Sequence, residues 1–359
     1  MKKLILLLVL FTSNVIFSQN YKFGKVSKEE LSEKTHPIDS NAKAAYLYKD
    51  KEVYMDYDAN NGWTLVTVVH ERIKFYNKDA AEYALEKIRI YGRGGTDEEV
   101  SELKAYTYNL EGGKIKKEKL SKKNVFTNKT SENWSTISFT MPNIKDGSIV
   151  EWKYKKTSPY FQYIDRVELQ HNIPINKLKV LVKIPEYYTY KTHYAGYLQM
   201  YFNESEKTKA MRYSYRSSIS GRVGGNTERI NESVDVRFRY YELLKDNVPA
   251  FESDELYISS EVNYKSSAKF ELNMIYYPGD KPKYYSTSWD DVAKRIYKTA
   301  AFGEELEKAS YYKSDLEGLL AGKTSEEEKA IAIYQFVKSK VKWNKNLGKY
   351  TVDGVRRAY

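Results

Sequence analysis

The spacing of hydrophobic residues changes once along the chain, from the two-residue period of strands to the 3.6-residue period of helices. Residues 63–76 show the strand pattern most clearly. One face of this segment carries Leu65, Thr67, Val69, Ile73 and Phe75, with Glu71 as an exception, and the other carries His70, Arg72 and Lys74. The alternation predicts a long strand with one apolar face and one basic face.

Turn residues separate this strand from its neighbours. Asn60-Asn61-Gly62 follows a strand expected at residues 53–58 and predicts a tight hairpin, because such a turn needs positive φ angles. Gly112-Gly113 predicts a second hairpin. Further strands are expected between residues 46 and 184 at 83–91, 102–109, 114–120, 136–141, 148–154, 167–171 and 178–184. So many short strands with regular turns predict an antiparallel β-sandwich.

The strand pattern continues through residues 187–278. Candidate strands lie at 198–203, 211–215, 234–241 and 270–277. The Gly and Ser residues of 218–226 predict a flexible loop between two of them. The sequence leaves open whether residues 46–278 form one large sandwich or two smaller ones.

The helical period begins after Pro278-Gly279. Ser288 is placed to cap a helix with an apolar stripe, and residues 304–320 predict one or two short helices. The third helix, residues 324–344, has Thr324 and Ser325 as caps with Glu327 and Glu328 at capping-box spacing. Its apolar stripe consists of Ala330, Ile333, Tyr334, Val337 and Val341. The chain is therefore expected to be mainly β, followed by α.

The N-terminus has the pattern of a secretory signal peptide. Lys2 and Lys3 precede an apolar run, and Ser18 offers a small residue for cleavage before Gln19. The run is too short to span a bilayer, and no other segment approaches that length. Residues 1–18 are therefore expected to direct export to the periplasm or outer surface. Residues 19–45 are expected to be a loosely packed leader with a short helix.

Composition limits the classes of partner that the protein is expected to bind. The 359 residues carry a net charge of +11 and 35 tyrosines. An exported basic protein is expected to meet acidic polymers or lipid head groups rather than nucleic acid. The basic run at residues 114–123 is interpreted as a solvated strand and turn. Tyrosine is typical of half-buried strands, so the tyrosines are interpreted as strand residues. The alternative interpretation is that their rings form binding platforms for sugar rings.

Three motifs resemble known sites and are set aside. His70-Glu71 begins like a zinc-protease motif, but Lys74 stands where the second histidine is required. A calcium loop at Asp56, Asp58, Asn60 and Gly62 has its glycine one position late, and Thr67 replaces the bidentate glutamate. The glycines of residues 92–95 have no predicted helix after them, as a phosphate loop requires.

No catalytic, cofactor-binding or metal-binding residue is assigned from the sequence. The chain has no cysteine, which excludes disulfides and a cysteine nucleophile in these 359 residues. The other histidines, His36, His171 and His193, lie near no nucleophile motif. Asp290-Asp291 is expected to serve the N-terminus of its helix.

Four stretches carry two resemblances to known families. TMPNIKDGSIVEWKY at residues 140–154 and IPINKLKVLVKIPE at 173–186 resemble a domain of unknown function that precedes a transglutaminase-like core in many bacterial envelope proteins. EEKAIAIYQFVKSKVKWN at 327–344, with GKYTVDGVRRAY at 348–359, resembles the entry to that core, a papain-like α+β domain. The resemblance implies that residues 286–359 are its first helices. It also implies that a catalytic Cys, His and Asp follow Tyr359.

Two functions are consistent with these patterns. The first is the N-terminal part of a transglutaminase-like cysteine peptidase or amide-processing enzyme, inactive without residues beyond Tyr359. The alternative is a non-enzymatic envelope module that binds a glycan or a protein partner. The sequence does not determine the oligomeric state.

Overall fold

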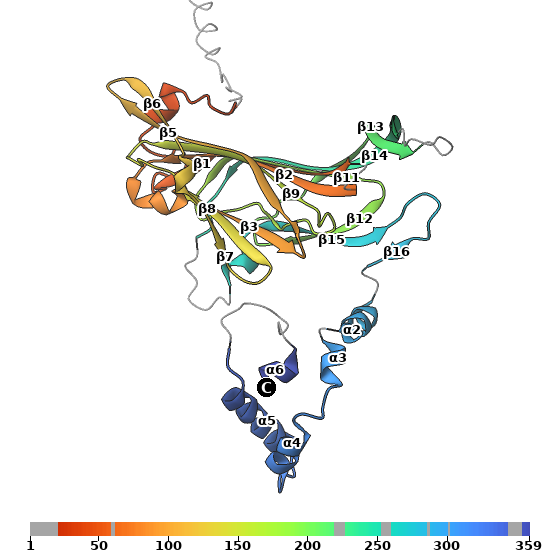
Figure 1. Cartoon of the computed structure of the whole chain (residues 1–359). Helices are drawn as coiled ribbons and strands as arrows, with labels where there is room; N and C mark the ends of the chain where they lie inside the picture. The colour runs from red at the N-terminus through yellow and green to blue at the C-terminus, as the bar shows by residue number, and fades with distance from the viewer. Residues whose placement is uncertain are drawn as a thin grey trace, which may run out of the picture.

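The computed structural model describes residues 21–58, 62–218, 227–252, 260–285, 288–300, 302–343 and 354–359. The expected signal peptide lies outside them. The described chain is mainly β, with three sheets stacked in two layers and a group of helices beyond them (Figure 1). No described helix is long and apolar enough to cross a membrane.

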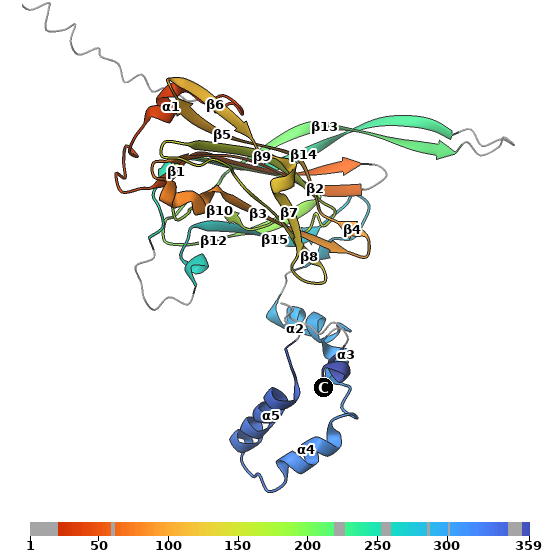
Figure 2. The same cartoon turned by 60° about the vertical axis from the view of Figure 1, so that its left-hand side comes forward.

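The larger layer is an eight-stranded sheet in the order β13-β14-β11-β1-β2-β9-β5-β6. Its strands are β1 (Ala44–Asp58), β2 (Gly62–Phe75), β5 (Glu99–Glu111), β6 (Lys114–Lys119), β9 (Ile149–Ser158), β11 (Ile175–Pro185), β13 (Asn203–Ser218) and β14 (Thr227–Val248). All neighbours are antiparallel except β1 and β11, so the purely antiparallel expectation was wrong at this pair. Figure 2 shows β13 and β14 extending beyond the body as a long hairpin.

Two smaller sheets form the second layer (Figure 1). One has β10 (Val167–Glu168), β15 (Ser267–Ile275), β12 (Tyr188–Ala195) and β16 (Lys283–Tyr284); the other has β4 (Thr96–Asp97), β3 (Leu85–Arg93), β8 (Trp134–Thr140) and β7 (Val125–Lys129). Short 3₁₀ helices occur at Lys78–Ala84, Lys122–Asn124 and Glu261–Asn263.

One continuous hydrophobic core lies between the layers. It includes Val69 and Ile73 of β2, which share the apolar face that alternation predicts. Trp152 of β9 packs edge-on against Phe139 of β8, with ring centroids 6.0 Å apart. Residues of all three sheets contribute, so the packing of each sheet depends on the others.

Both predicted hairpins are present. Asp58 pairs with Gly62, whose φ is +72°, although residues 59–61 lie outside the described part. Gly112 and Gly113, at φ +55° and +70°, connect β5 to β6. The strand expected at residues 198–203 was wrong, because only Asn203 belongs to a strand. Met200 and Phe202 are nevertheless buried in the core. The segment therefore has alternating apolar residues, as a strand would have.

The N-terminal segment contradicts the expectation of a loosely packed leader. Residues 21–33 lie against the face of the large sheet opposite the core, and they include α1 (Lys28–Ser32). Ser27 and Glu30 form a capping box at its start. Leu31 is only 4% exposed and packs with Leu47, Tyr108 and Ile149. Residues of this segment are therefore part of the folded body.

The helices after the sheets are α2 (Trp289–Tyr297), α3 (Gly303–Leu306), α4 (Lys313–Leu320), α5 (Glu326–Lys340) and α6 (Val355–Ala358). Ser288 accepts the amide N–H of Asp291, and Ser325 forms a capping box with Glu328, as the sequence predicts. Figure 1 places the helices outside the two β layers. Their apolar residues are largely exposed, and Trp289 is 88% exposed.

Candidate functional site

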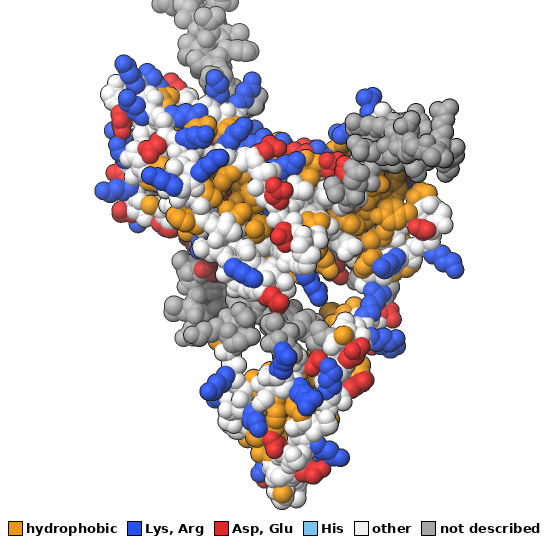
Figure 3. Space-filling model, in the orientation of Figure 1, with side chains coloured by type: hydrophobic (Ala, Val, Ile, Leu, Met, Phe, Trp, Pro, Cys, Tyr) orange, Lys and Arg blue, Asp and Glu red, His pale blue; other side chains and the backbone are white. Residues whose placement is uncertain are grey.

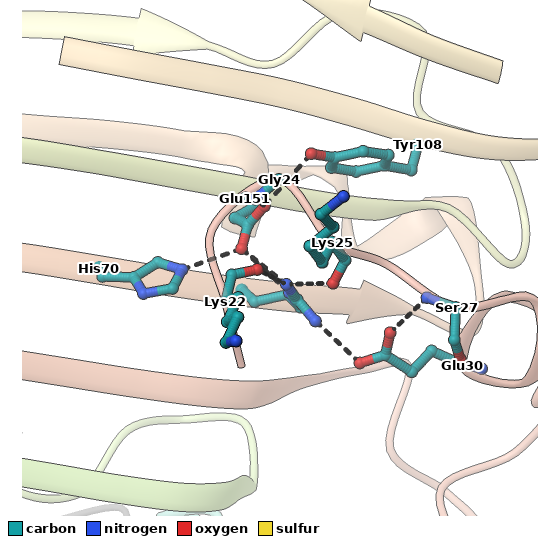
Figure 4. Close-up of polar contacts among 9 residues, drawn as sticks. Lys22, Gly24, Lys25, Ser27, Glu30, His70, Tyr108 and Glu151 are labelled. Atoms are coloured by element: carbon teal, nitrogen blue, oxygen red, sulfur yellow. Dashed lines mark hydrogen bonds and ion pairs between the residues drawn. The ribbon is translucent and has the colours of Figure 1, made fainter. Parts of the chain in front are cut away.

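The most connected polar cluster of the described chain lies between the N-terminal segment and the basic face of β2 (Figure 4). The alternation of β2 directs His70, Arg72 and Lys74 away from the hydrophobic core. Residues 21–33 cover this face, so all three side chains are buried. Burial of charged groups requires partners, and the cluster supplies them.

Glu151 of β9 is the centre of the cluster and is fully buried. Its Oε1 accepts hydrogen bonds from Arg72 Nη2 at 2.8 Å and from His70 Nε2 at 2.9 Å. Its Oε2 accepts the Gly24 amide at 2.8 Å and the Tyr108 hydroxyl at 3.2 Å. Burial disfavours the charged form, but the donors of His70 and Arg72 outweigh it and hold the pKa of Glu151 below its ordinary value.

Arg72 joins the sheet to the N-terminal segment. Its Nη2 donates to the backbone carbonyl oxygens of Lys25 at 2.7 Å and Lys22 at 3.1 Å. Its Nη1 donates to Glu30 Oε1 at 2.9 Å, and Glu30 also caps α1. One guanidinium therefore fixes an extended stretch and the start of a helix at once.

Lys74 fixes the other end of α1. Its ammonium donates to the carbonyl oxygen of Leu31 at 2.7 Å and to that of Gly147 at 2.9 Å. Burial lowers the pKa of Lys74 to about 8. A cation at a helix C-terminus satisfies carbonyls that the helix leaves without partners.

The hydrogen bonds of this cluster join the N-terminal segment to the sheet. Both carboxylate oxygens of Glu151 and all three guanidinium nitrogens of Arg72 have protein partners. His70 contributes a hydrogen bond to Glu151 and an edge contact to Phe23, with ring centroids 5.5 Å apart. The cluster holds residues 21–33 on the sheet.

A second group of titratable side chains lies on the opposite, core-facing side of the large sheet. Glu71 pairs with Lys49 of β1, and the Tyr154 hydroxyl donates to Glu86 Oε1 at 3.0 Å. Burial, followed by the nearby Glu71 carboxylate, raises the pKa of Glu86 to about 8. Burial also lowers the pKa of Lys51.

Glu86→Gln is expected to remove a pH dependence of stability. Because the folded-state pKa of Glu86 is raised, the folded chain retains a proton that the unfolded chain has released, and stability falls as pH rises from about 5 through about 8. The glutamine does not titrate and can still accept from Tyr154. Melting temperatures of the two proteins should be similar near pH 5, diverge as pH rises to about 8 and stay apart above it, with the native protein lower. Glu99→Gln, at an exposed position of β5, is the matched control, and parallel curves for Glu86→Gln would contradict the assignment.

The structure shows where the described residues of the three motifs lie. His70 and Glu71 point to opposite faces of β2, so they cannot bind one metal ion. Gly94 and Gly95 form the turn between β3 and β4, with no helix after them. Asp56 and Asp58 end β1, and Asn60 lies outside the described residues.

The remaining histidines are dispersed. His36 bonds to Asn176 Oδ1 at 2.8 Å and accepts the Asp39 amide at 2.9 Å. Burial lowers the pKa of His171 well below its ordinary value. His193 lies on the surface beside Glu271. Among the described residues no group of three His, Asp or Glu side chains has the arrangement of a metal site.

The sequence offered one unused signal for Glu151. It is the single acidic residue in the strand segment IVEWKY, and a carboxylate among the large apolar residues of a strand indicates a partner. Alternation alone could not identify Arg72, which lies 79 residues away in sequence.

A comparison with known protein families finds a match within the β-rich region. A family model matches residues 64–220. That family is described as a domain of unknown function with solved structure, DUF3857. The match includes β2 and β9 and thus both Arg72 and Glu151, whereas residues 21–33 and the helices lie outside it. No curated protein matches the sequence.

One solved structure shows a similar fold at low identity. A crystal structure described as "a putative protease from Parabacteroides distasonis" aligns with a TM-score of 0.53 and 13% identity, over 83% of this chain and 50% of that one. This chain thus spans about half the length of that structure. Yeast LTA4 hydrolase in complex with bestatin aligns with a TM-score of 0.26 and 8% identity, over 65% of this chain and 30% of that one.

Proposed function

We propose that this chain is the N-terminal part of an exported transglutaminase-like cysteine hydrolase, in which α2 to α6 are the first helices of the catalytic domain. The DUF3857 region would then be the accessory β domain that precedes the enzyme. The catalytic cysteine, histidine and aspartate would belong to the remainder of that domain, and the chain itself would have no hydrolase activity.

The observation that carries this proposal is the exposure of apolar residues on the helices. Ile331, Tyr334 and Val337 of α5 are 54%, 63% and 47% exposed, and Trp289 of α2 is 88% exposed. Helices with caps and apolar stripes bury those stripes in stable domains. The Parabacteroides structure, twice as long as the part that matches, offers a fold in which further chain is present.

The proposal is tested by extending the chain. The locus is sequenced past codon 359, and any longer open frame is expressed and assayed for cleavage of peptide amides. The expected result is peptide cleavage that iodoacetamide abolishes. Replacement of the cysteine encoded past codon 359 by alanine should also abolish it. The 359-residue chain serves as the inactive control. A long frame without a Cys, His and Asp set, or peptide cleavage by the 359-residue chain itself, would contradict the proposal.

Export is tested separately. Cell fractionation is expected to find the mature protein outside the cytoplasm. N-terminal sequencing is expected to show Gln19 as its first residue. A chain that retains Met1 in the cytoplasmic fraction would rule out residues 1–18 as a functional signal.

A further inference from the structure

One end of the large sheet carries a concentration of lysines on the face opposite the core. We define this lysine face as Lys104 of β5, Lys117 and Lys119 of β6, Lys153 and Lys155 of β9, and Lys22 and Lys25 of the N-terminal segment. Figure 3 shows Lys and Arg side chains predominating over the end of the molecule that carries β5 and β6.

The strand register places like charges next to each other. Lys104 lies directly opposite Lys153 on the neighbouring strand. Like charges at opposite cross-strand positions destabilise a sheet. Tyr106, two residues along β5, faces Glu151, but that carboxylate is already bonded to Arg72 and His70. Glu151 therefore does not relieve the repulsion between Lys104 and Lys153.

Two lysines elsewhere on the same sheet face have acidic partners. Lys179 of β11 lies 3.5 Å from Asp50, and Lys183 pairs with Glu52, both carboxylates being on the adjacent strand β1. On the lysine face, by contrast, no ammonium lies within 4.0 Å of a described carboxylate. The unbalanced positive charge is thus local to β5, β6, β9 and the segment over them.

Aromatic rings lie among these lysines. The ring centroid of Phe23 is 5.9 Å from that of Tyr106, and Lys117 Nζ is 3.8 Å from the Tyr106 centroid. Both rings are half-buried, and the lysine face exposes no large hydrophobic side chain of its described residues. A membrane-inserting surface would expose such side chains, so this composition favours a polar ligand.

We propose that the lysine face binds an anionic polysaccharide through its carboxylate or sulfate groups. Strand geometry spaces the Cα atoms of these lysines at roughly 5 Å across strands and roughly 7 Å along them, so their flexible side chains present a row of charges to a repeating polyanion. Lysine is a point charge on a flexible stem, so it accepts anions without fixed geometry. Half-buried rings between the lysines supply flat apolar surface for sugar rings.

The probe is polygalacturonate, titrated against the 359-residue chain by calorimetry at low and at physiological ionic strength. Binding that weakens with added salt is expected, together with no binding of neutral dextran. Lys104→Glu combined with Lys153→Glu should weaken affinity about tenfold or more. The control pair, Lys87→Glu with Lys269→Glu, makes the same charge change at exposed positions of β3 and β15 and should leave affinity within about twofold.

A third variant separates binding from folding. Lys104→Gln with Lys153→Gln removes the repulsion, so its melting temperature should equal or exceed that of the native protein while polygalacturonate binding falls. Equal losses in the control pair, or binding of dextran, would overturn the proposal. So would binding of phosphatidylglycerol vesicles or single-stranded DNA without binding of polygalacturonate. The chain tested carries no catalytic cysteine, so the result is independent of the enzymatic proposal.

Discussion

Arg72→Ala is expected to lower the free energy of unfolding by about 3–5 kcal/mol, the usual result of removing one partner from a buried ion pair. The substitution leaves Glu151 with its charge in a buried position and with His70, Tyr108 and the Gly24 amide as its remaining donors. It also removes the donor for two backbone carbonyl groups and the partner of Glu30. These losses share one cause, because a single guanidinium bonds the sheet and the N-terminal segment.

Denaturant unfolding followed by tryptophan fluorescence measures this effect. Arg237→Ala is the matched control, since Arg237 forms an ion pair with Glu186 at 3.2 Å but its side chain is 58% exposed. An exposed ion pair contributes about 0–1 kcal/mol, so the control should unfold almost as the native protein does. A change below about 1 kcal/mol for Arg72→Ala would show that the buried cluster does not stabilise the fold.

Deletion of residues 21–33 is expected to destabilise the β layers by at least about 3 kcal/mol. Burial of Leu31 contributes on the order of 2 kcal/mol, and each hydrogen bond to a buried charge adds about 1.5–3 kcal/mol before the exposed charges regain water. For a chain of 359 residues, a loss of about 3 kcal/mol should lower the melting temperature by about 4 °C. Amide hydrogen exchange should increase in β2 and β9, which the segment covers.

A synthetic peptide of residues 21–33 provides the control for this deletion. If the segment stabilises the sheet by binding it, the peptide added to the truncated chain should raise the melting temperature in a concentration-dependent way. The same peptide with Glu30→Ala lacks the partner of Arg72 Nη1 and should be less effective. An unchanged melting temperature after deletion would contradict the role assigned to the segment.

The sequence by itself determined the features that depend on neighbouring residues. Asn-Gly and Gly-Gly pairs place hairpins because they tolerate positive φ angles, and Ser288 and Ser325 start helices because their hydroxyls accept backbone N–H groups. The alternation in β2 correctly separated Val69 and Ile73 from His70, Arg72 and Lys74. These are local rules, so one stretch of chain is sufficient to apply them.

Only the tertiary structure decided what covers each face. Residues 21–33 were expected to be loose, yet their carbonyl groups and Glu30 complete a cluster on strands that lie 42 or more residues away in sequence. The parallel pairing of β1 with β11 and the position of the second layer depend on equally distant segments. Alternation predicts that the two faces of a strand differ, but it does not predict which distant residues form hydrogen bonds with a buried Arg72 or Glu151. That choice follows from the cost of burying a charge without a partner, which is met only when the whole chain is folded.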